Sequence, residues 1–392
     1  MVRILFIEWK SLGQIDITAE FKRRGYIVDF YSFPRETENT RLNMELGEKL
    51  IRTIAGKNYD FIFSFNYFPV VAIASNACMV KYVSWTFDSP FIQLYSNTIF
   101  FPYNYIFVFD KAVCLDLWAH GANSVYYLPM AAPVERYDGY IINDELRKFY
   151  GTQLSFIGST YSEQKNCFYE RLSGLKEYTK GYLDGCIQVQ KKVYGKFILE
   201  SMLTPEIMED LQRVCPTVVN QDGFERLAWV YAHYFLARHV TALERQEILG
   251  LLSERFHVDF YTYEQTPRLP KVNNRGTAEV MQEGPVIYKC SKINLNVSLK
   301  SIISGIPLRA FDIMGCGGFL LSNYQEDFLE YFIPGQDYVY YEDYDDLLNK
   351  ADYYLVHEKE REEIARNGYE KVKKYHTYKE RVDTILEVTN YK

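Results

Sequence analysis

The sequence predicts an α/β protein built from two doubly wound domains, each a mostly parallel sheet with helices on both faces. Its 392 residues provide for roughly two to three domains at about 150 residues each. Short apolar runs alternate with helical patterns in two series, separated by a charged, tyrosine-rich break over residues 134–150. The runs are almost entirely apolar, as expected for strands buried on both faces.

The first series indicates an N-terminal Rossmann-like domain over residues 1–150. We expect strands at residues 3–7, 27–31, 61–65, 81–85, 105–109 and 125–128, and helices at 15–24, 41–56 and 111–120. Residues 61–80 carry no charge and are as long as a membrane span. Polar residues and a proline interrupt them, however, so we expect a strand, a loop and a short buried helix.

The second series indicates a domain over residues 151–375. We expect strands at residues 153–157, 257–262, 293–297 and 318–322, and helices at 165–175, 187–203, 206–214 and 225–247. A helical insertion therefore occupies about 177–247. The tail at 357–388 reads as a long, charged amphipathic helix, and we expect the C-terminal helix, 376–392, to pack back toward the first domain. The two domains should face each other across a cleft, with ligands beyond the carboxyl ends of the strands.

Composition excludes several classes of protein. With 44 Lys and Arg against 51 Asp and Glu, the net charge is −7, which is unfavourable for binding nucleic acid. The seven cysteines form no C-x-x-C pair and show no metal-ligand spacing, so we expect no disulfide framework or metal site. The opening residues are apolar for too short a run to be a secretory signal. These features favour a soluble cytoplasmic protein.

The richest candidate site follows the expected strand at 293–297. Gly305 allows close backbone approach, and a helix beginning near Ile306 would present its positive end to an anion. Lys300 and Arg309 are cations suited to phosphates, and Asp312 could accept hydrogen bonds from a ribose diol. Together they would form a pocket for a nucleoside diphosphate. Alternatively, Arg309 and Asp312, three residues apart, pair with each other on a helix surface.

A second candidate site is the turn after the strand at 153–157. There the backbone of Gly158 and Ser159 could approach a phosphate, and the charge of Lys165 could neutralise it. The same residues are equally compatible with an ordinary strand-to-helix loop.

Two further loops follow strands of the first domain. Asp88 stands beside Trp85 among aromatic residues, where a raised pKa would suit a general base. It could instead hold a sugar hydroxyl or cap the next helix. Gly13, in the loop after the first strand, either admits substrate or shapes the turn. Motifs for serine hydrolases and P-loops do not stand out in the sequence, and we identify no Asp-x-Asp that would hold a metal ion.

The segment that contains Gly305, Arg309 and Asp312 resembles a known sequence signature. The run Ser-Gly-Ile-Pro-Leu-Arg-Ala-Phe-Asp-Ile-Met-Gly-Cys-Gly-Gly-Phe-Leu-Leu, which begins at Ser304, resembles the donor-site signature of GT-B glycosyltransferases of the group 1 type. More narrowly, it is similar to the bacterial spore-maturation-protein (CgeB-like) glycosyltransferases. Supporting pieces lie at residues 85–90, 156–159, 292–297 and 367–378.

The resemblance implies transfer of a sugar from a nucleotide-activated donor, held by the second domain, to an acceptor hydroxyl. By position, Asp312 matches the second acidic residue of the group's paired-glutamate motif, which contacts the ribose. The first acidic position falls on Ser304, a departure that leaves the phosphates to Arg309 and Lys300. We expect a metal-independent enzyme without cofactor, with a UDP-sugar as the first donor to test.

On this reading Asp88 orients or deprotonates the acceptor, a carbohydrate or glycosylated molecule, and Gly13 and Trp85 lie on the acceptor side. Two alternatives stay open: a non-catalytic nucleotide-sugar- or carbohydrate-binding protein, and a nucleotide-sugar epimerase of the same fold. The sequence leaves open the base, the sugar, the acceptor, the stereochemistry and the oligomeric state. The helical insertion could shape an acceptor site or a dimer contact.

Overall fold

The computed structural model describes residues 1–35, 38–161 and 168–391, which form two compact units. Unit 1 comprises Met1–Ala131, Val219–Arg226 and Thr377–Lys392, and unit 2 comprises Ala132–Val218 and Leu227–His376. Unit 2 begins before residue 151, the boundary expected from the sequence. The tyrosine-rich break is partly helical and belongs to unit 2, forming α5 (Val134–Asp138) and α6 (Asp144–Tyr150).

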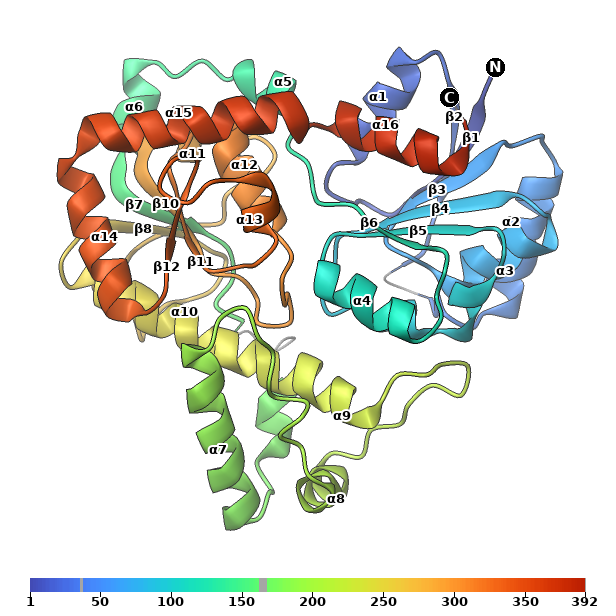
Figure 1. Cartoon of the computed structure of the whole chain (residues 1–392), viewed down its shortest axis with the longest axis horizontal. Helices are drawn as coiled ribbons and strands as arrows, with labels where there is room; N and C mark the ends of the chain where they lie inside the picture. The colour runs from blue at the N-terminus through green and yellow to red at the C-terminus, as the bar shows by residue number, and fades with distance from the viewer. Residues whose placement is uncertain (36–37, 162–167, 392) are drawn as a thin grey trace. The chain divides into compact units, whose positions relative to one another are not determined.

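In the described residues, unit 1 has a six-stranded parallel sheet in the order β2-β1-β3-β4-β5-β6. The strands are β1 (Arg3–Glu8), β2 (Ile27–Ser32), β3 (Phe61–Phe65), β4 (Lys81–Thr86), β5 (Asn104–Val108) and β6 (Val125–Tyr127). Helices α1 (Gln14–Arg23) and α16 (Tyr378–Thr389) cover one face (Figure 1). The other face carries α2 (Met44–Ala55), α3 (Pro69–Ala77) and α4 (Lys111–Ala119). The expected strand, loop and buried helix over residues 61–80 are confirmed by β3 and α3.

Aromatic rings fill the core of unit 1, which accounts for much of the aromatic excess. Phe6, Phe61, Phe63 and Phe65 of the central strands are fully buried against Phe21 of α1. Their centroids lie 5.4–6.3 Å apart in tilted and edge-on pairs, arrangements that aromatic quadrupoles favour. The rings therefore stabilise the sheet and are not available to a ligand.

Unit 2 has a second six-stranded parallel sheet in its described residues, in the order β12-β11-β10-β7-β8-β9. The strands are β7 (Thr152–Ile157), β8 (Val258–Tyr261), β9 (Asn273–Gly276), β10 (Ser291–Asn296), β11 (Leu320–Asn323) and β12 (Val339–Tyr341). The short strands β9 and β12 were not expected from the sequence. They lie at the two edges, where a strand needs less apolar sequence.

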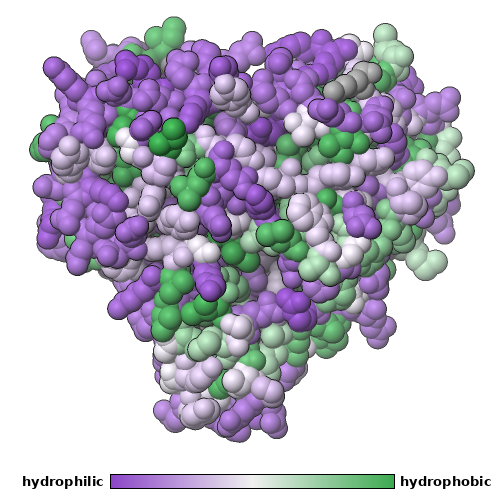
Figure 2. Space-filling model, in the orientation of Figure 1, coloured by the Kyte–Doolittle hydropathy of each residue, from purple (hydrophilic) through white to green (hydrophobic). Residues whose placement is uncertain are grey.

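Helices cover both faces of this sheet as well (Figure 1). On one face lie α10 (Ala237–Ser253) and α14 (Tyr344–Val356); on the other lie α11 (Gly284–Cys290), α12 (Leu308–Gly315), the short α13 (Phe328–Tyr331) and α15 (Glu358–Tyr375). The surface of α15 is strongly hydrophilic in Figure 2, because only one stripe of this helix, including Ile364, Gly368 and Val372, is buried. No helix in the described parts of the chain is long and apolar enough to cross a membrane.

The helical insertion differs in detail from the expectation. The helix expected at 187–203 is α7 (Glu177–Lys192), followed by an irregular segment that contains Gly195 at φ +71°. The helix expected at 206–214 is α8 (Pro205–Val214). The helix expected at 225–247 is divided into α9 (Leu227–Val230), a π-helical turn, η4 (Tyr231–Leu236), and α10. Of the helix expected at 165–175, the described part is a 3₁₀ turn, η3 (Phe168–Leu172).

Part of the insertion, Val219–Arg226, belongs to unit 1. The buried Arg41 donates to both carboxylate oxygens of Asp222 at 3.0 Å and to Glu225 at 3.1 Å. Phe224 packs against Tyr95, beside the 3₁₀ turns η1 (Ile92–Tyr95) and η2 (Asn97–Phe100). An ion network thus secures this segment in unit 1.

Candidate functional site

The carboxyl edge between β7 and β10 is the place where unit 2 could bind a ligand. From β7 the chain proceeds to β8 and β9 on one side, and then to β10, β11 and β12 on the other. The order therefore reverses between β7 and β10, which lie side by side. Open α/β sheets bind ligands at such a switch point, because the loops after the two strands separate there.

Gly158 and Arg309 meet at this point. Gly158 follows β7 with φ +155°, and a Cβ atom on it would lie 2.8 Å from Nη2 of Arg309. Nη1 of Arg309 donates to the side-chain oxygen of Asn296, at the end of β10, at 3.0 Å. The half-buried guanidinium also lies 4.8 Å from the centroid of the Phe156 ring. A side chain at position 158 would therefore displace this guanidinium, whose hydrogen-bond partner among the described residues is a neutral amide and not a carboxylate.

Arg245 of α10 joins the two loops of the switch point. Nη1 donates to the carbonyl of Ser159 at 2.6 Å, and Nε donates to the carbonyl of Val297 at 3.1 Å. Its guanidinium lies 5.2 Å from the centroid of the Phe156 ring. Burial lowers the pKa of Arg245 to about 10, and the positive charge of Arg309 adds to the decrease. Two guanidinium groups therefore lie against one ring.

Lys300 is placed differently from the expectation. Its ammonium lies 3.1 Å from the carboxylate of Glu244 and 3.9 Å from the centroid of the Tyr194 ring, and all but 9% of the residue is buried. Burial lowers the pKa of Lys300, while Glu244 acts in the opposite direction. Its charge is already met by Glu244. The backbone amide of Lys300 donates to Thr241 at 3.0 Å, so the residue also anchors the loop after β10 on α10.

Asp312 lies in the middle of α12 and is 7% exposed. Its oxygen Oδ1 accepts a hydrogen bond from the hydroxyl of Tyr137 at 2.7 Å. The backbone carbonyls of Ser304 and Gly305 accept hydrogen bonds from the amide of Asp327 and the side chain of Gln325, each at 3.0 Å. The loop before α12 is thus fixed by its neighbours, and α12 begins at Leu308, two residues later than expected.

The turn after β7 is braced by a buried carboxylate. The amide of Thr160 donates to Glu264 at 2.7 Å, and the Thr160 hydroxyl donates to the same side chain. The hydroxyl oxygen of Ser159 accepts from the amide of Tyr161 at 2.7 Å. Lys165, the cation predicted for this turn, lies outside the described residues.

In unit 1, Asp88 lies among polar side chains at the carboxyl ends of β3 and β4. Asn66, fully buried with φ +62°, donates to Asp88 at 2.9 Å. Its side-chain oxygen accepts from the amides of Phe87 at 2.9 Å and Asp88 at 3.2 Å. Arg35 forms an ion pair with Asp88 and lies 3.9 Å from the centroid of the Trp9 ring. The carboxylate side chain, 43% exposed, is therefore held firmly and open to solvent.

Two residues predicted for the acceptor side have structural roles in unit 1. Trp85 is fully buried, and its indole donates to the carbonyl of Leu128 at 3.2 Å, so its face is not available to an acceptor. Gly13 has φ +82° at the start of α1, and a Cβ atom there would collide with the hydroxyl of Tyr378 in α16. Glycine is needed at this position for packing.

Sequence reasoning missed several of these residues. Asn66 and Asn296 are amides next to apolar strands, a signal for a buried polar group that must find partners. Arg245 lies on the buried stripe of α10 with Ile248, Leu249 and Leu252, at helical spacing. A charged residue in such a stripe indicates a specific role, because Arg is almost never fully buried without partners. Arg35 had no comparable signal.

Within the described residues, no group of three or more His, Cys, Asp or Glu side chains is gathered as a metal ion would require.

Comparisons with known proteins agree with this geometry. Residues 239–387 match the model of a family described as "Glycosyl transferase-like". A search of curated protein sequences gives no match. Several solved structures share the fold over the whole chain. HepE from Anabaena, in complex with UDP-glucose, matches with TM-score 0.56 and 11% identity, covering 100% of both chains.

Sucrose-phosphate synthase from Thermosynechococcus elongatus matches with TM-score 0.56 and 10% identity, covering 100% of this chain and 98% of that one. The complex of S. aureus MnaA with UDP matches with TM-score 0.50 and 10% identity, over 100% and 98% of the two chains. At these identities the likeness establishes the fold. The chain has the GT-B fold of two Rossmann-like domains.

Proposed function

We propose that the protein transfers a sugar from a nucleoside-diphosphate donor to an acceptor hydroxyl, with a UDP-sugar as the donor. The observation that carries the proposal is the pair of guanidinium groups, Arg245 and Arg309, on the Phe156 ring at the β7–β10 switch point. The matched segment, 239–387, includes both arginines. The UDP and UDP-glucose complexes of MnaA and HepE support the choice of donor.

The chemistry explains why a diphosphate suits this site. When the bond between the sugar carbon and the diphosphate oxygen breaks, its electron pair stays on the diphosphate, while the acceptor oxygen bonds to the sugar carbon. Fixed positive charge near the leaving group stabilises that transition state. Arg309 is half-exposed and can contact the diphosphate, and Arg245 is buried and keeps both loops in place. The protein's own cations would thus meet the charge, so we propose that no metal is needed.

Asp88 is our candidate for taking up the proton that the acceptor hydroxyl loses. Arg35 and Asn66 hold its carboxylate in a fixed, half-exposed position, as a general base requires. Asp312, whose oxygen Oδ1 is hydrogen-bonded to Tyr137, is proposed to contact the ribose.

Isothermal titration calorimetry with UDP, GDP, dTDP and ADP tests the donor assignment. We expect UDP to bind, and Arg309→Ala to weaken its binding by about 10- to 100-fold, because a hydrogen bond to a charged group contributes about 1.5–3 kcal/mol. The control is Arg366→Ala, an exposed arginine on α15. The expected affinity is the same with and without EDTA. No binding of any nucleotide, or equal binding by both variants, would overturn the proposal.

Turnover separates an enzyme from a binding protein. Release of UDP from UDP-sugars, measured with candidate saccharide acceptors, should depend on Asp88. If the protein binds a UDP-sugar but releases no UDP with any of the acceptors, the non-catalytic alternative is favoured.

A further inference from the structure

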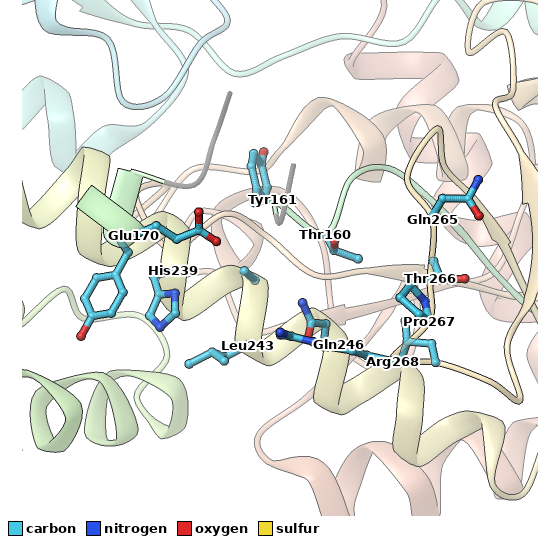
Figure 3. A pocket seen from close by; sticks show the side chains of 13 residues that line it. Thr160, Tyr161, Glu170, His239, Leu243, Gln246, Gln265, Thr266, Pro267 and Arg268 are labelled. Carbon is cyan, nitrogen blue, oxygen red and sulfur yellow. The ribbon is translucent and has the colours of Figure 1, made fainter. Parts of the chain in front are cut away.

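A pocket of about 280 Å³ lies in unit 2 beside the loops of the switch point. Figure 3 shows His239, Leu243 and Gln246 along one side of α10, with the segment from Gln265 to Arg268, after β8, opposite them. Thr160 and Tyr161, after β7, and Tyr169 and Glu170 of the turn η3 also line it. The lining includes neither Gly158 nor Arg309, so the pocket is distinct from the site proposed for the diphosphate.

The walls of this pocket are fixed before any ligand binds. Thr160 is held by Glu264 through its amide and its hydroxyl. The side chain of Asn274 donates to the carbonyl of Glu264 at 2.9 Å and to the hydroxyl of Thr266 at 3.2 Å, which fixes the loop after β8. His239 stacks on Tyr169 with ring centroids 3.9 Å apart and planes 8° from parallel. A preformed pocket requires little ordering of the protein when a ligand enters.

The chemistry of the lining suits an uncharged, hydroxyl-rich ring. Gln246 and Gln265 offer amide donors and acceptors, Leu243 and the stacked rings offer apolar surface, and Arg268 and Glu170 carry opposite charges. Burial lowers the pKa of His239, so the imidazole is uncharged at neutral pH and can both donate and accept. A phosphate would meet one cation and one carboxylate here, which is unfavourable for a dianion.

The size of the pocket is also suitable. Its volume of about 280 Å³ is close to the roughly 300 Å³ at which small-ligand pockets begin, which suits a ligand as small as a single pyranose ring. Apolar walls with a few placed polar groups are typical of small-ligand sites.

We propose that this pocket binds one neutral pyranose unit of a saccharide acceptor. Because it specifies the acceptor class, the inference rests on the proposed transferase function. The acceptor would then be an oligosaccharide or glycosylated molecule, with one ring in the pocket.

Saturation-transfer NMR on the full chain tests the proposal with glucose, galactose, mannose and N-acetylglucosamine, each at about 10 mM, tenfold above a millimolar Kd. We expect at least one sugar to receive saturation. Leu243→Trp, which fills the pocket, and Gln246→Ala, which removes an amide, should each reduce the signal at least fivefold. Gln282→Ala, an exposed glutamine elsewhere in unit 2, is the control. UDP is measured in the same samples, and its signal should persist in all three variants.

Two results would overturn the inference: no sugar receives saturation, or the signal survives in Leu243→Trp. A signal that survives in Leu243→Trp could also disappear in Arg309→Ala. The last result would assign the sugar to the diphosphate site. If UDP gives no signal with the unsubstituted chain, the proposed donor is refuted. The sugar signals would still show whether the pocket binds a pyranose. The two failures are therefore distinguishable.

Discussion

The contact between Gly158 and Arg309 gives the sharpest test of the donor site. In Gly158→Ala, the new Cβ atom would lie 2.8 Å from Nη2 of Arg309, whereas ordinary contacts begin at 3.4 Å. The guanidinium must therefore move by about 0.2–0.6 Å, which is comparable with the roughly 0.5 Å tolerance of a preorganised site. The movement also disturbs the hydrogen bond from Arg309 to Asn296.

Two effects of this substitution can be separated. Alanine at φ +155° is strained, at about 1–3 kcal/mol, and each kcal/mol lowers Tm by about 2–4 °C in a domain of 150–250 residues. Displacement of Arg309 weakens a charge-assisted contact, and complete loss of that contact is worth about 1.5–3 kcal/mol. We therefore expect the Kd for UDP to rise about tenfold, with about 100-fold as the upper bound.

Gly317→Ala is the matched control. Gly317 also has positive φ, +76°, but a Cβ atom on it would meet nothing within 4 Å. It should lower Tm through backbone strain and leave the affinity for UDP unchanged. Calorimetric titration with UDP, performed well below the Tm of every variant, compares the three proteins. If Gly158→Ala binds UDP as tightly as the unsubstituted chain, Arg309 does not contact the diphosphate and the site is misassigned.

Three further predictions concern other parts of the chain. Asp88→Asn should lower the transfer rate by about 10²- to 10⁴-fold with an unchanged Kd for UDP; an unchanged rate in a steady-state assay would exclude Asp88 as the base. Arg41→Met leaves Asp222 and Glu225 without their cation and should destabilise unit 1 by about 3–5 kcal/mol in urea unfolding; a loss under about 1 kcal/mol would contradict a stabilising network. Burial lowers the pKa of His239 below 6.5, so the unfolded chain takes up this proton first as pH falls, and the native state is penalised below about pH 6.5. Between pH 7.5 and 5.5, His239→Gln should lose less Tm than the unsubstituted chain, and equal losses would show that this ring does not titrate as inferred.

The fold was predictable because its signals are local. Nearly continuous apolar runs between helical patterns predicted the central strands of both sheets, and β1, β3, β4, β7 and β10 lie where they were expected. The edge strand β9 escaped prediction, since Asn273–Gly276 has no apolar run, and β12, Val339–Tyr341, is only three residues long. The division of the insertion between two units also has no local signal, because it depends on the partners of Asp222 and Glu225, which are distant in sequence.

The candidate site was only partly predictable, because a role in a site depends on the direction and burial of each side chain. Gly158 and Arg309 were identified separately, from a turn and from a helix start, and the structure brings them into contact. Trp85 was expected at a ligand because it precedes Asp88 by three residues. Its position inside β4 directs it into the core instead.

The roles of Lys300 and Arg245 were also hard to predict, because burial decides which partners their charges have. From the sequence, Lys300 was expected to bind the phosphates of a ligand, and Glu244 and Arg245 were given no role. The structure buries all three, and the two neighbours on α10 take different partners. Glu244 pairs with Lys300 and removes it from the cations available to a ligand, while Arg245 binds the backbone carbonyls of both switch-point loops. A buried charge must be paired or hydrogen-bonded, and the partners inside the protein already do this for Lys300 and Arg245. Arg309 is therefore the half-exposed guanidinium best placed for the diphosphate.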